Sequence, residues 1–185
     1  MASTLLLLLS LSTQGLTDFS NEFDNSFRYS SERFLTRDWR QLKAQAIQES
    51  RLKPGAISPA GAMGILQVMP VSWAMCERAM NLNASPYSAK ANIICGAWHM
   101  SRLDRNWNRR GRDSTEIWLL SLASYNAGIG NILKAQGKCD DAIYWRDIQP
   151  CIYMITGYEN SYQTTRYVVL IPQTFYQMKN RPQND

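Results

Sequence analysis

Apolar residues recur at helical spacing along most of the chain, and no segment keeps the alternation that is typical of a β-strand. The spacing predicts helices from about Asp38, from Pro70, over about 93–107, from about Asp113 and over about 163–178, with a shorter one of one to three turns over 140–147. Pro70 suits the first turn of the second helix, and residues 113–116 (DSTE) resemble a capping box at the start of the fourth. Residues 126–128 (NAG) should end that fourth helix, and Pro172 should kink the last one. The expected fold class is mainly α.

The N-terminus contains a short run of leucines, residues 5–9, followed by small polar residues. This run is too short to cross a bilayer but has the length of the apolar core of a signal peptide. No Lys or Arg occurs before Arg28, so a short buried N-terminal helix stays open as the alternative. Residues 1–32 are therefore expected to be an apolar segment and a polar linker or loosely docked arm, residues 33–180 one catalytic domain, and residues 181–185 a tail.

Length and charge narrow the class of protein. The 185 residues, 45% of them hydrophobic, suffice for one buried core. The net charge of +5 favours anionic targets such as the bacterial wall, acidic lipid or nucleic acid. The arginines at 105 and in the run 109–112 are interpreted as a solvated loop, with a polyanion contact as the alternative.

The cysteines and the single histidine limit the chemistry. Four cysteines without a C-x-x-C pair, and one histidine, His99, argue against a zinc site, so no metal or cofactor is expected. Local disulfides, Cys76–Cys95 and Cys139–Cys151, are one of three pairings open to an exported chain; four free thiols in a cytoplasmic protein are the alternative. His99 is interpreted as a structural residue on a helix.

Glu49 is the candidate for acid catalysis. It shares one helical face with Leu42 and Ala46, at positions i, i+4 and i+7. Partial burial there should raise its pKa and keep the carboxyl protonated, as a general acid requires. A buried Glu paired with an arginine is the alternative.

The loop that follows, residues 58–64 (SPAGAMG), has little side-chain bulk. We expect it to offer bare backbone N–H and C=O groups to an extended polar ligand, with the amide of Gln67 beside them. Residues 125–128 (YNAG) offer a second polar and aromatic group, which could equally be a helix C-cap.

Together these segments resemble the soluble-type lytic transglycosylases, which share the goose-type lysozyme fold. The matching motifs are residues 46–50 (AIQES), 58–70 (SPAGAMGILQVMP), 92–96 (NIICG), 124–128 (SYNAG) and 167–168 (YV). Their order and spacing agree over most of the chain. Gln163 departs from the glutamate that many members carry before the late tyrosine.

The resemblance implies cleavage of the MurNAc–GlcNAc β-1,4 bond of peptidoglycan with a 1,6-anhydro product. Glu49 would be the single acid and base, assisted by the substrate's own acetamido group. The remaining site residues implied as substrate-binding are Ser50, Gly64, Gln67, Met69, Tyr125, Asn126 and Tyr167. Asp104, Glu116 and Glu159 are interpreted as structural.

Two other functions stay open: a hydrolytic goose-type lysozyme, which would need a second acid such as Asp104 or Glu159, and a non-catalytic wall-binding or assembly protein. The expected partner is the peptidoglycan glycan strand, with envelope-spanning or virion assembly as a further setting and no nucleic acid. A monomer without a stable transmembrane span is expected, located outside the cytoplasm, in the periplasm or on a virion.

Overall fold

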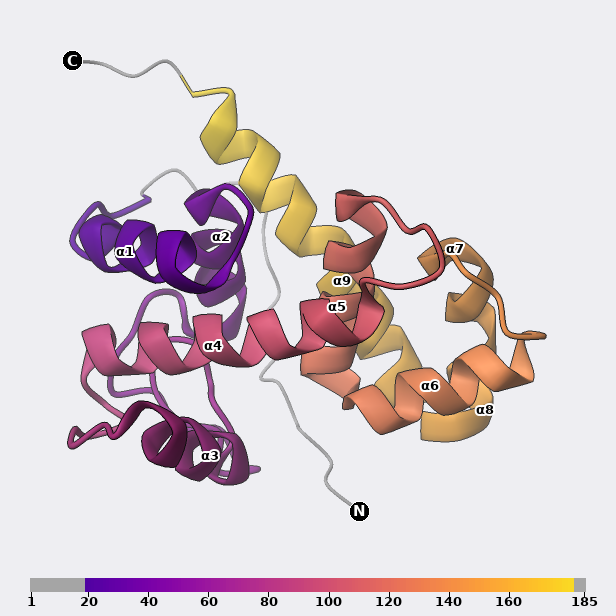
Figure 1. The fold of residues 1–185 in the computed structure, drawn as a ribbon, viewed down its shortest axis with the longest axis horizontal. Coiled ribbons are helices and arrows are strands. Elements are labelled where there is room, and N and C mark those ends of the chain that lie inside the picture. The colour runs from indigo at the N-terminus through magenta and orange to yellow at the C-terminus, as the bar shows by residue number, and fades with distance from the viewer. Residues whose placement is uncertain (1–18, 182–185) are drawn as a thin grey trace. The chain divides into compact units, whose positions relative to one another are not determined.

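The computed structural model describes residues 19–181. Within that range every regular element is a helix, and no β-strand is formed (Figure 1). Two isolated β-bridges, Ile57 with Met63 and Met63 with Val68, are the only extended pairings there. The helices are α1 Asp24–Phe34, α2 Trp39–Ser50, α3 Pro70–Met80, α4 Ala89–Trp107, α5 Ser114–Ala127, α6 Ile129–Lys138, α7 Trp145–Ile148, η1 Gln149–Cys151, α8 Tyr153–Thr156 and α9 Tyr158–Lys179. The mainly α fold class is confirmed.

The predicted helix starts have clear local causes. Asp38 caps α2, since its side chain accepts from the N–H of Arg40 at 3.0 Å. Pro70 occupies the first turn of α3. Asp113 caps α5 by accepting from the N–H of Glu116 at 2.9 Å. The capping box is not closed, because a carboxylate oxygen of Glu116 accepts from the N–H of Trp145 at 2.8 Å instead.

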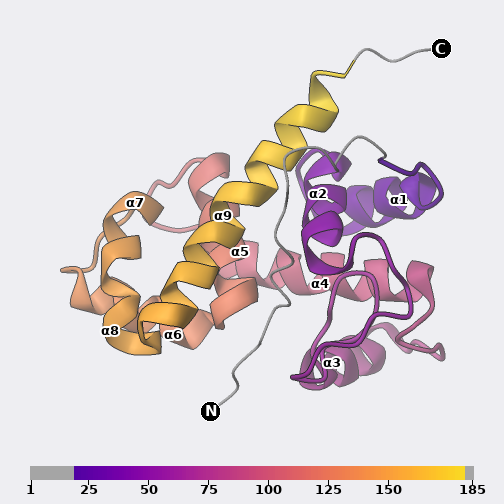
Figure 2. The same ribbon diagram turned by 180° about the vertical axis from the view of Figure 1, so that it is seen from behind.

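The polar linker predicted before residue 33 is wrong for residues 24–32, because they belong to α1. Phe23 and Phe27 are four residues apart, and Phe27 is fully buried. The ammonium of Lys43 also lies 2.6 Å from a carboxylate oxygen of Asp24, which joins α2 to α1. The two helices lie side by side in both views (Figures 1 and 2). The domain boundary placed after residue 32 therefore cuts through a helix. The leucine run lies outside the described residues.

The helix predicted over 140–147 is also largely wrong. Asp140 and Asp141 have φ of 51° and 55°, which a right-handed helix cannot accommodate, and α7 begins only at Trp145. The sequence pattern missed α6, whose start follows Gly128 at φ 85°. The last helix, α9, begins earlier than predicted and contains Pro172, as expected; whether that proline kinks it stays a prediction.

The described chain forms two compact units. The first contains residues up to His99 together with those from Ile171, and the second contains Met100–Leu170. Fully buried side chains in the first unit include Phe27, Ile65, Leu66 and Ile93; those in the second include Leu120, Leu122, Ile132, Ile148 and Ile152. Figure 2 shows α6, α7 and α8 gathered in the second unit.

The arginine cluster is not simply a solvated loop. Arg112 is buried, and its guanidinium donates to the carbonyls of Ile143 at 2.7 Å and Arg109 at 3.2 Å. The prediction is therefore wrong for this residue, because its charge is used to hold the chain that leads into α7. Burial lowers the pKa of the Arg112 guanidinium, and the neighbouring charge of Arg110 adds to that effect.

Candidate active site

Glu49 lies in the last turn of α2, one residue before the helix ends, and its side chain is half-buried. The preceding residues 42–47 are all buried, so α2 is packed around more of its circumference than a single apolar face. No basic residue occupies the last turn.

The chain turns away sharply just after this acid. Arg51 and Leu52 both adopt left-handed backbone conformations, with φ of 56° and 60°. Two consecutive non-glycine residues in this region are costly and persist only where surrounding contacts hold them. The turn leads the chain from the end of α2 into the small-residue loop, which Ser50 contacts at Ile65.

Ser50 fixes that loop against the end of α2. Its hydroxyl donates to the carbonyl of Ile65 at 2.7 Å and accepts from the N–H of Lys53 at 3.1 Å. The Ser50 hydroxyl therefore donates its proton to the loop, and Ser50, the residue after Glu49, fixes the position of the loop at Ile65.

The loop is less open than expected, because it closes on its own backbone. The N–H of Gly64 donates to Ala56 at 2.8 Å, and Met63 and Val68 exchange two hydrogen bonds of 3.0 and 2.9 Å. The expectation that these backbone groups stay bare for a ligand is wrong, since they are paired within the loop. What the small residues allow is close packing of the loop on itself and on α4.

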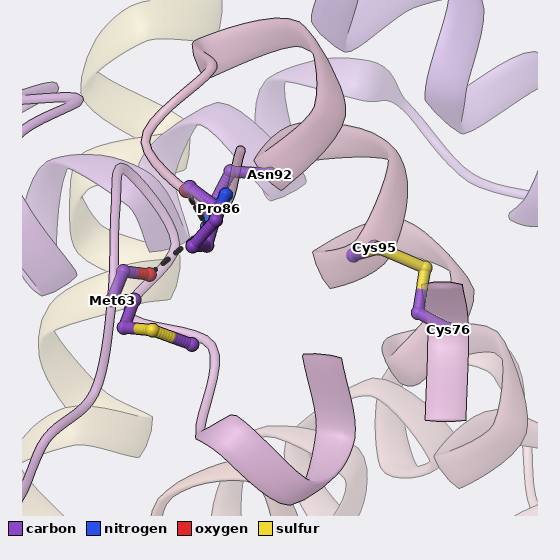
Figure 3. Close-up of a disulfide and its surroundings, with 5 residues drawn as sticks. All are labelled: Met63, Cys76, Pro86, Asn92 and Cys95. Atoms are coloured by element: carbon purple, nitrogen blue, oxygen red, sulfur yellow. Dashed lines mark hydrogen bonds between the residues drawn. A yellow bond between two sulfur atoms is a disulfide. The ribbon is translucent and has the colours of Figure 1, made fainter. Parts of the chain in front are cut away.

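Asn92, on α4, is the main anchor of the loop (Figure 3). Its amide nitrogen donates to the carbonyls of Met63 at 2.9 Å and Pro86 at 2.8 Å, and its carbonyl oxygen accepts from the N–H of Leu66 at 2.8 Å. The side chain is fully buried. One amide therefore joins two loops to one helix, a role that motif matching could not reveal.

Two glycines make this close approach possible. A Cβ on Gly64 would lie 2.5 Å from the carbonyl oxygen of Pro86 and 2.6 Å from Cγ of Asn92, and its φ is +74°. A Cβ on Gly96 would collide with the side chain of Leu66. The structure thus gives Gly64 a packing role; contact with substrate stays a prediction for it.

Gln67 has a strained backbone, with φ of 47°, and is buried. Its amide nitrogen donates to the carbonyls of Gly64 at 2.9 Å and Ala56 at 3.2 Å. Both N–H groups are used inside the loop, which leaves the amide oxygen as the group available to a ligand. Met69 follows as the N-cap residue of α3 and is half-buried.

Both local disulfides are present, so the local pairing is confirmed. Cys76–Cys95 joins α3 to α4, with Cα atoms 5.5 Å apart (Figure 3). Cys95 lies three residues after Asn92 on α4. Cys139–Cys151 joins the end of α6 to η1 in the second unit, with Cα atoms 5.9 Å apart.

The other predicted site residues belong to the second unit. Tyr125 and Asn126 lie at the end of α5, which Gly128 terminates as predicted. The side-chain oxygen of Asn126 accepts from the hydroxyl of Thr164 at 2.8 Å, so the end of α5 is joined to α9. Tyr167 lies one turn further along α9 and is buried. In the first unit, hydrogen bonds join Ser50 to the loop that contains Gly64 and Gln67. In the second unit, the bond from Thr164 to Asn126 joins the end of α5 to the part of α9 that carries Tyr167.

No group of three or more His, Cys, Asp or Glu side chains between residues 19 and 181 could hold a metal ion. None of the helices in that range combines the length and hydropathy needed to cross a bilayer.

Residues 30–148 match the family described as the transglycosylase SLT domain, and the chain belongs to that family. Among curated relatives, it is 29% identical over 153 residues to the membrane-bound lytic murein transglycosylase F of Hahella chejuensis and 31% identical over 137 residues to that of Shewanella halifaxensis. The alignment with the Hahella protein covers 79% of this chain but 28% of that protein, and the alignment with the Shewanella protein covers 70% and 27%. The chain therefore spans less than a third of the length of these relatives.

Solved structures show the same fold. The 70 kDa soluble lytic transglycosylase of Escherichia coli matches with a TM-score of 0.69 at 19% identity, over 88% of this chain and 25% of that one. An inactive glutamate-to-glutamine mutant of the lytic transglycosylase Slt from Pseudomonas aeruginosa matches with a TM-score of 0.68 at 20% identity, over 89% of this chain and 25% of that one. The expected lysozyme-like helical fold is thereby confirmed.

Proposed function

We propose that this protein is a peptidoglycan lytic transglycosylase in which Glu49 is the only acid and base. The observation that carries the proposal is the position of Glu49: a half-buried carboxyl in the last turn of α2, beside a loop that Ser50 and Asn92 hold in place. The fixed loop provides a rigid wall for an extended substrate.

In the proposed reaction, protonated Glu49 donates its proton to the glycosidic oxygen between MurNAc and GlcNAc. The bond from C1 of MurNAc to that oxygen breaks, and GlcNAc leaves with a free hydroxyl. The carbonyl oxygen of the substrate's 2-acetamido group bonds to C1 and stabilises the positive charge.

Glu49, now a carboxylate, then removes the proton from the C6 hydroxyl of the same MurNAc. The C6 oxygen attacks C1 and displaces the acetamido oxygen, which forms the 1,6-anhydro ring and returns Glu49 to its protonated state. Water is not consumed, so no second carboxylate is needed.

The remaining residues are proposed to bind sugar, and for Gln67 the hydrogen bonds within the loop decide which polar atom is open to it. Gln67 would present its amide oxygen, because both of its N–H groups are used in the loop. Gly64, Met69, Tyr125, Asn126 and Tyr167 are proposed to contact the glycan. Ser50 is proposed to act as a positioning residue, since its hydroxyl holds Ile65.

The proposed setting is outside the cytoplasm, either in the periplasm or on a virion. Two disulfides are typical of oxidising compartments, and the curated relatives are named as murein enzymes. The protein would act as a monomer on glycan strands, and an excess of basic residues would favour binding to an acidic wall polymer at low salt.

The test is release of soluble fragments from purified sacculi by the wild type, by Glu49→Gln and by Glu77→Gln. Glu77 is the matched control, because it is an exposed carboxylate on α3. We expect a loss of at least a thousandfold for Glu49→Gln and no change for Glu77→Gln. Equal activity of Glu49→Gln and the wild type would contradict the assignment.

A further inference from the structure

The two disulfides differ in how far they can be reached from solvent. Cys76 and Cys95 are both fully buried. Cys151 keeps 7% exposure, and Cys139, just after α6, is only half-buried. A disulfide is reduced when a thiolate reaches one of its sulfur atoms, so access decides which of two disulfides is reduced first. The Cys139 sulfur is therefore the point at which a small reductant reaches the folded chain.

The turn that follows Cys139 is held against its own backbone preference. Asp140 and Asp141 both adopt left-handed conformations, with φ of 51° and 55°, and such a pair persists only where its surroundings hold it. Gln136 holds one side of the turn, because its carbonyl accepts from the N–H of Asp141 at 3.0 Å and its amide donates to the carbonyl of Ala142 at 2.7 Å. The disulfide holds the start of the same turn by joining Cys139 to η1.

The element at the other end of this disulfide, η1, is bonded to α9. Gln149 opens η1, two residues before Cys151, and its amide nitrogen donates to the hydroxyl of Thr165 at 3.1 Å. That hydroxyl donates in turn to the carbonyl of Ser161 at 2.9 Å, so it has a fixed orientation. The position of η1 is thereby tied to the first turns of α9.

The next residue of α9, Thr164, carries the connection to the end of α5. Its hydroxyl donates to the side-chain oxygen of Asn126 at 2.8 Å, and the threonine is 1% exposed. Asn126 is one of the residues proposed to bind the glycan. A path of covalent bonds and hydrogen bonds therefore runs from Cys151 through Gln149 and α9 to Asn126, and all of it lies in the second unit.

We propose that Cys139–Cys151 is a redox-controlled clamp, which positions the glycan-binding end of α5 through Gln149 and α9. The proposal rests on the proposed function for the identity of the glycan. With the clamp closed, Asn126 is held in place and the chain binds glycan at full strength. With the clamp reduced, η1 loosens and the affinity for glycan falls. The chain thus gains its full affinity only in an oxidising compartment, where its substrate lies.

The reductant is a dithiol, and the exchange balances in two steps. One thiolate of the dithiol bonds to the sulfur of Cys139, the S–S bond breaks, and Cys151 leaves as a thiolate that takes a proton from solvent. The second thiol loses its proton and attacks the mixed disulfide, which releases Cys139 as a thiol and leaves the reductant as a cyclic disulfide. Two electrons and two protons pass from the dithiol to the chain.

The first experiment measures which disulfide opens. The oxidised full chain is treated with dithiothreitol without denaturant, its thiols are alkylated at intervals, and the labelled peptides are counted by mass spectrometry. We expect Cys139 and Cys151 to be labelled at least tenfold faster than Cys76 and Cys95. Equal rates, or the reverse order, would overturn the proposal.

The second experiment measures binding without cleavage. The full chain carrying Glu49→Gln is titrated by calorimetry with soluble glycan strands, freed of their peptides by an amidase. We expect at least fivefold weaker binding after selective reduction, and the same loss for Gln149→Met with both disulfides intact. Gln173→Met is the matched control, because Gln173 is an exposed glutamine on α9, and it should bind as the oxidised parent does. Equal affinity of the oxidised and reduced chains would overturn the proposal.

The third experiment needs no glycan. Amide hydrogen exchange at residues 124–128 should rise on reduction and in Gln149→Met, while exchange in α2 and α3 stays unchanged. No change at 124–128, or an equal rise throughout the second unit, would overturn a positioning role. Absence of glycan binding in every form would contradict the proposed function, and the exchange at 124–128 would still decide whether the clamp positions the end of α5.

Discussion

Gly64→Ala should be one of the most destabilising single-methyl substitutions in the chain. The new Cβ would lie 2.5 Å from the Pro86 carbonyl oxygen, which is backbone and cannot rotate away, and 2.6 Å from Cγ of Asn92. It would also force a residue with a side chain into φ of +74°.

The cost can be worked out by parts. The left-handed conformation costs about 1 kcal/mol for alanine. Overpacking against fixed backbone costs about 1–3 kcal/mol. Displacing Asn92 weakens three buried hydrogen bonds, and each buried group left unpaired costs about 1–3 kcal/mol. With one of these buried groups left unpaired, the expected loss in free energy of unfolding is roughly 3–7 kcal/mol, a large share of the stability of a domain.

Two other glycines separate these contributions. Gly61→Ala meets no atom within 4 Å but has φ of +81°, so it should cost only about 1 kcal/mol. Gly55→Ala meets no atom and has no positive φ, so it should be neutral or slightly stabilising, by about 0.5 kcal/mol. Urea unfolding with both disulfides intact measures all three. A Gly64→Ala value within about 0.5 kcal/mol of that for Gly61→Ala would refute the packing argument, given typical errors.

Three further predictions concern charges and cross-links. Asp24→Asn should cost about 3 kcal/mol in urea unfolding, because it leaves the buried ammonium of Lys43 without its carboxylate; a loss under about 1 kcal/mol would contradict this. Replacing Cys139 and Cys151 by serine should cost about 2–4 kcal/mol, and an unchanged thermal midpoint would show that the cross-link is not stabilising. Burial raises the pKa of Asp38, but the hydrogen bonds from its neighbour outweigh this and hold the pKa below its usual value. Its stabilisation is therefore full above the unfolded pKa of about 3.9 and lost as pH falls below it, so Asp38→Asn should flatten the acid side of the stability profile; an identical acid limb would contradict the linkage.

Much of the fold could be predicted from local signals. Asp38, Pro70, Asp113 and Gly128 each act within one turn of their own position, so their capping and terminating roles were visible in the sequence. The local disulfide pairing was among the predictions for the same reason, because both pairs close short loops.

What was missed depends on partners far away in the sequence. Phe27 is buried in α1 although its neighbours are polar, and the ion pair from Asp24 to Lys43 spans nineteen residues. The loop was expected to be open because its side chains are small. Its backbone is instead paired internally and anchored by Asn92, and no local pattern of residues identifies the acceptors of that amide.

The central claim is that Glu49 drives cleavage without water. The most direct measurement is mass spectrometry of fragments released from purified sacculi in water labelled with heavy oxygen, with Glu49→Gln alongside. The account predicts wild-type fragments that end in an anhydro sugar, lack one water relative to reducing ends and carry no label, with none released by the variant. Labelled reducing ends would show hydrolysis, and would contradict the claim that one carboxylate completes the reaction.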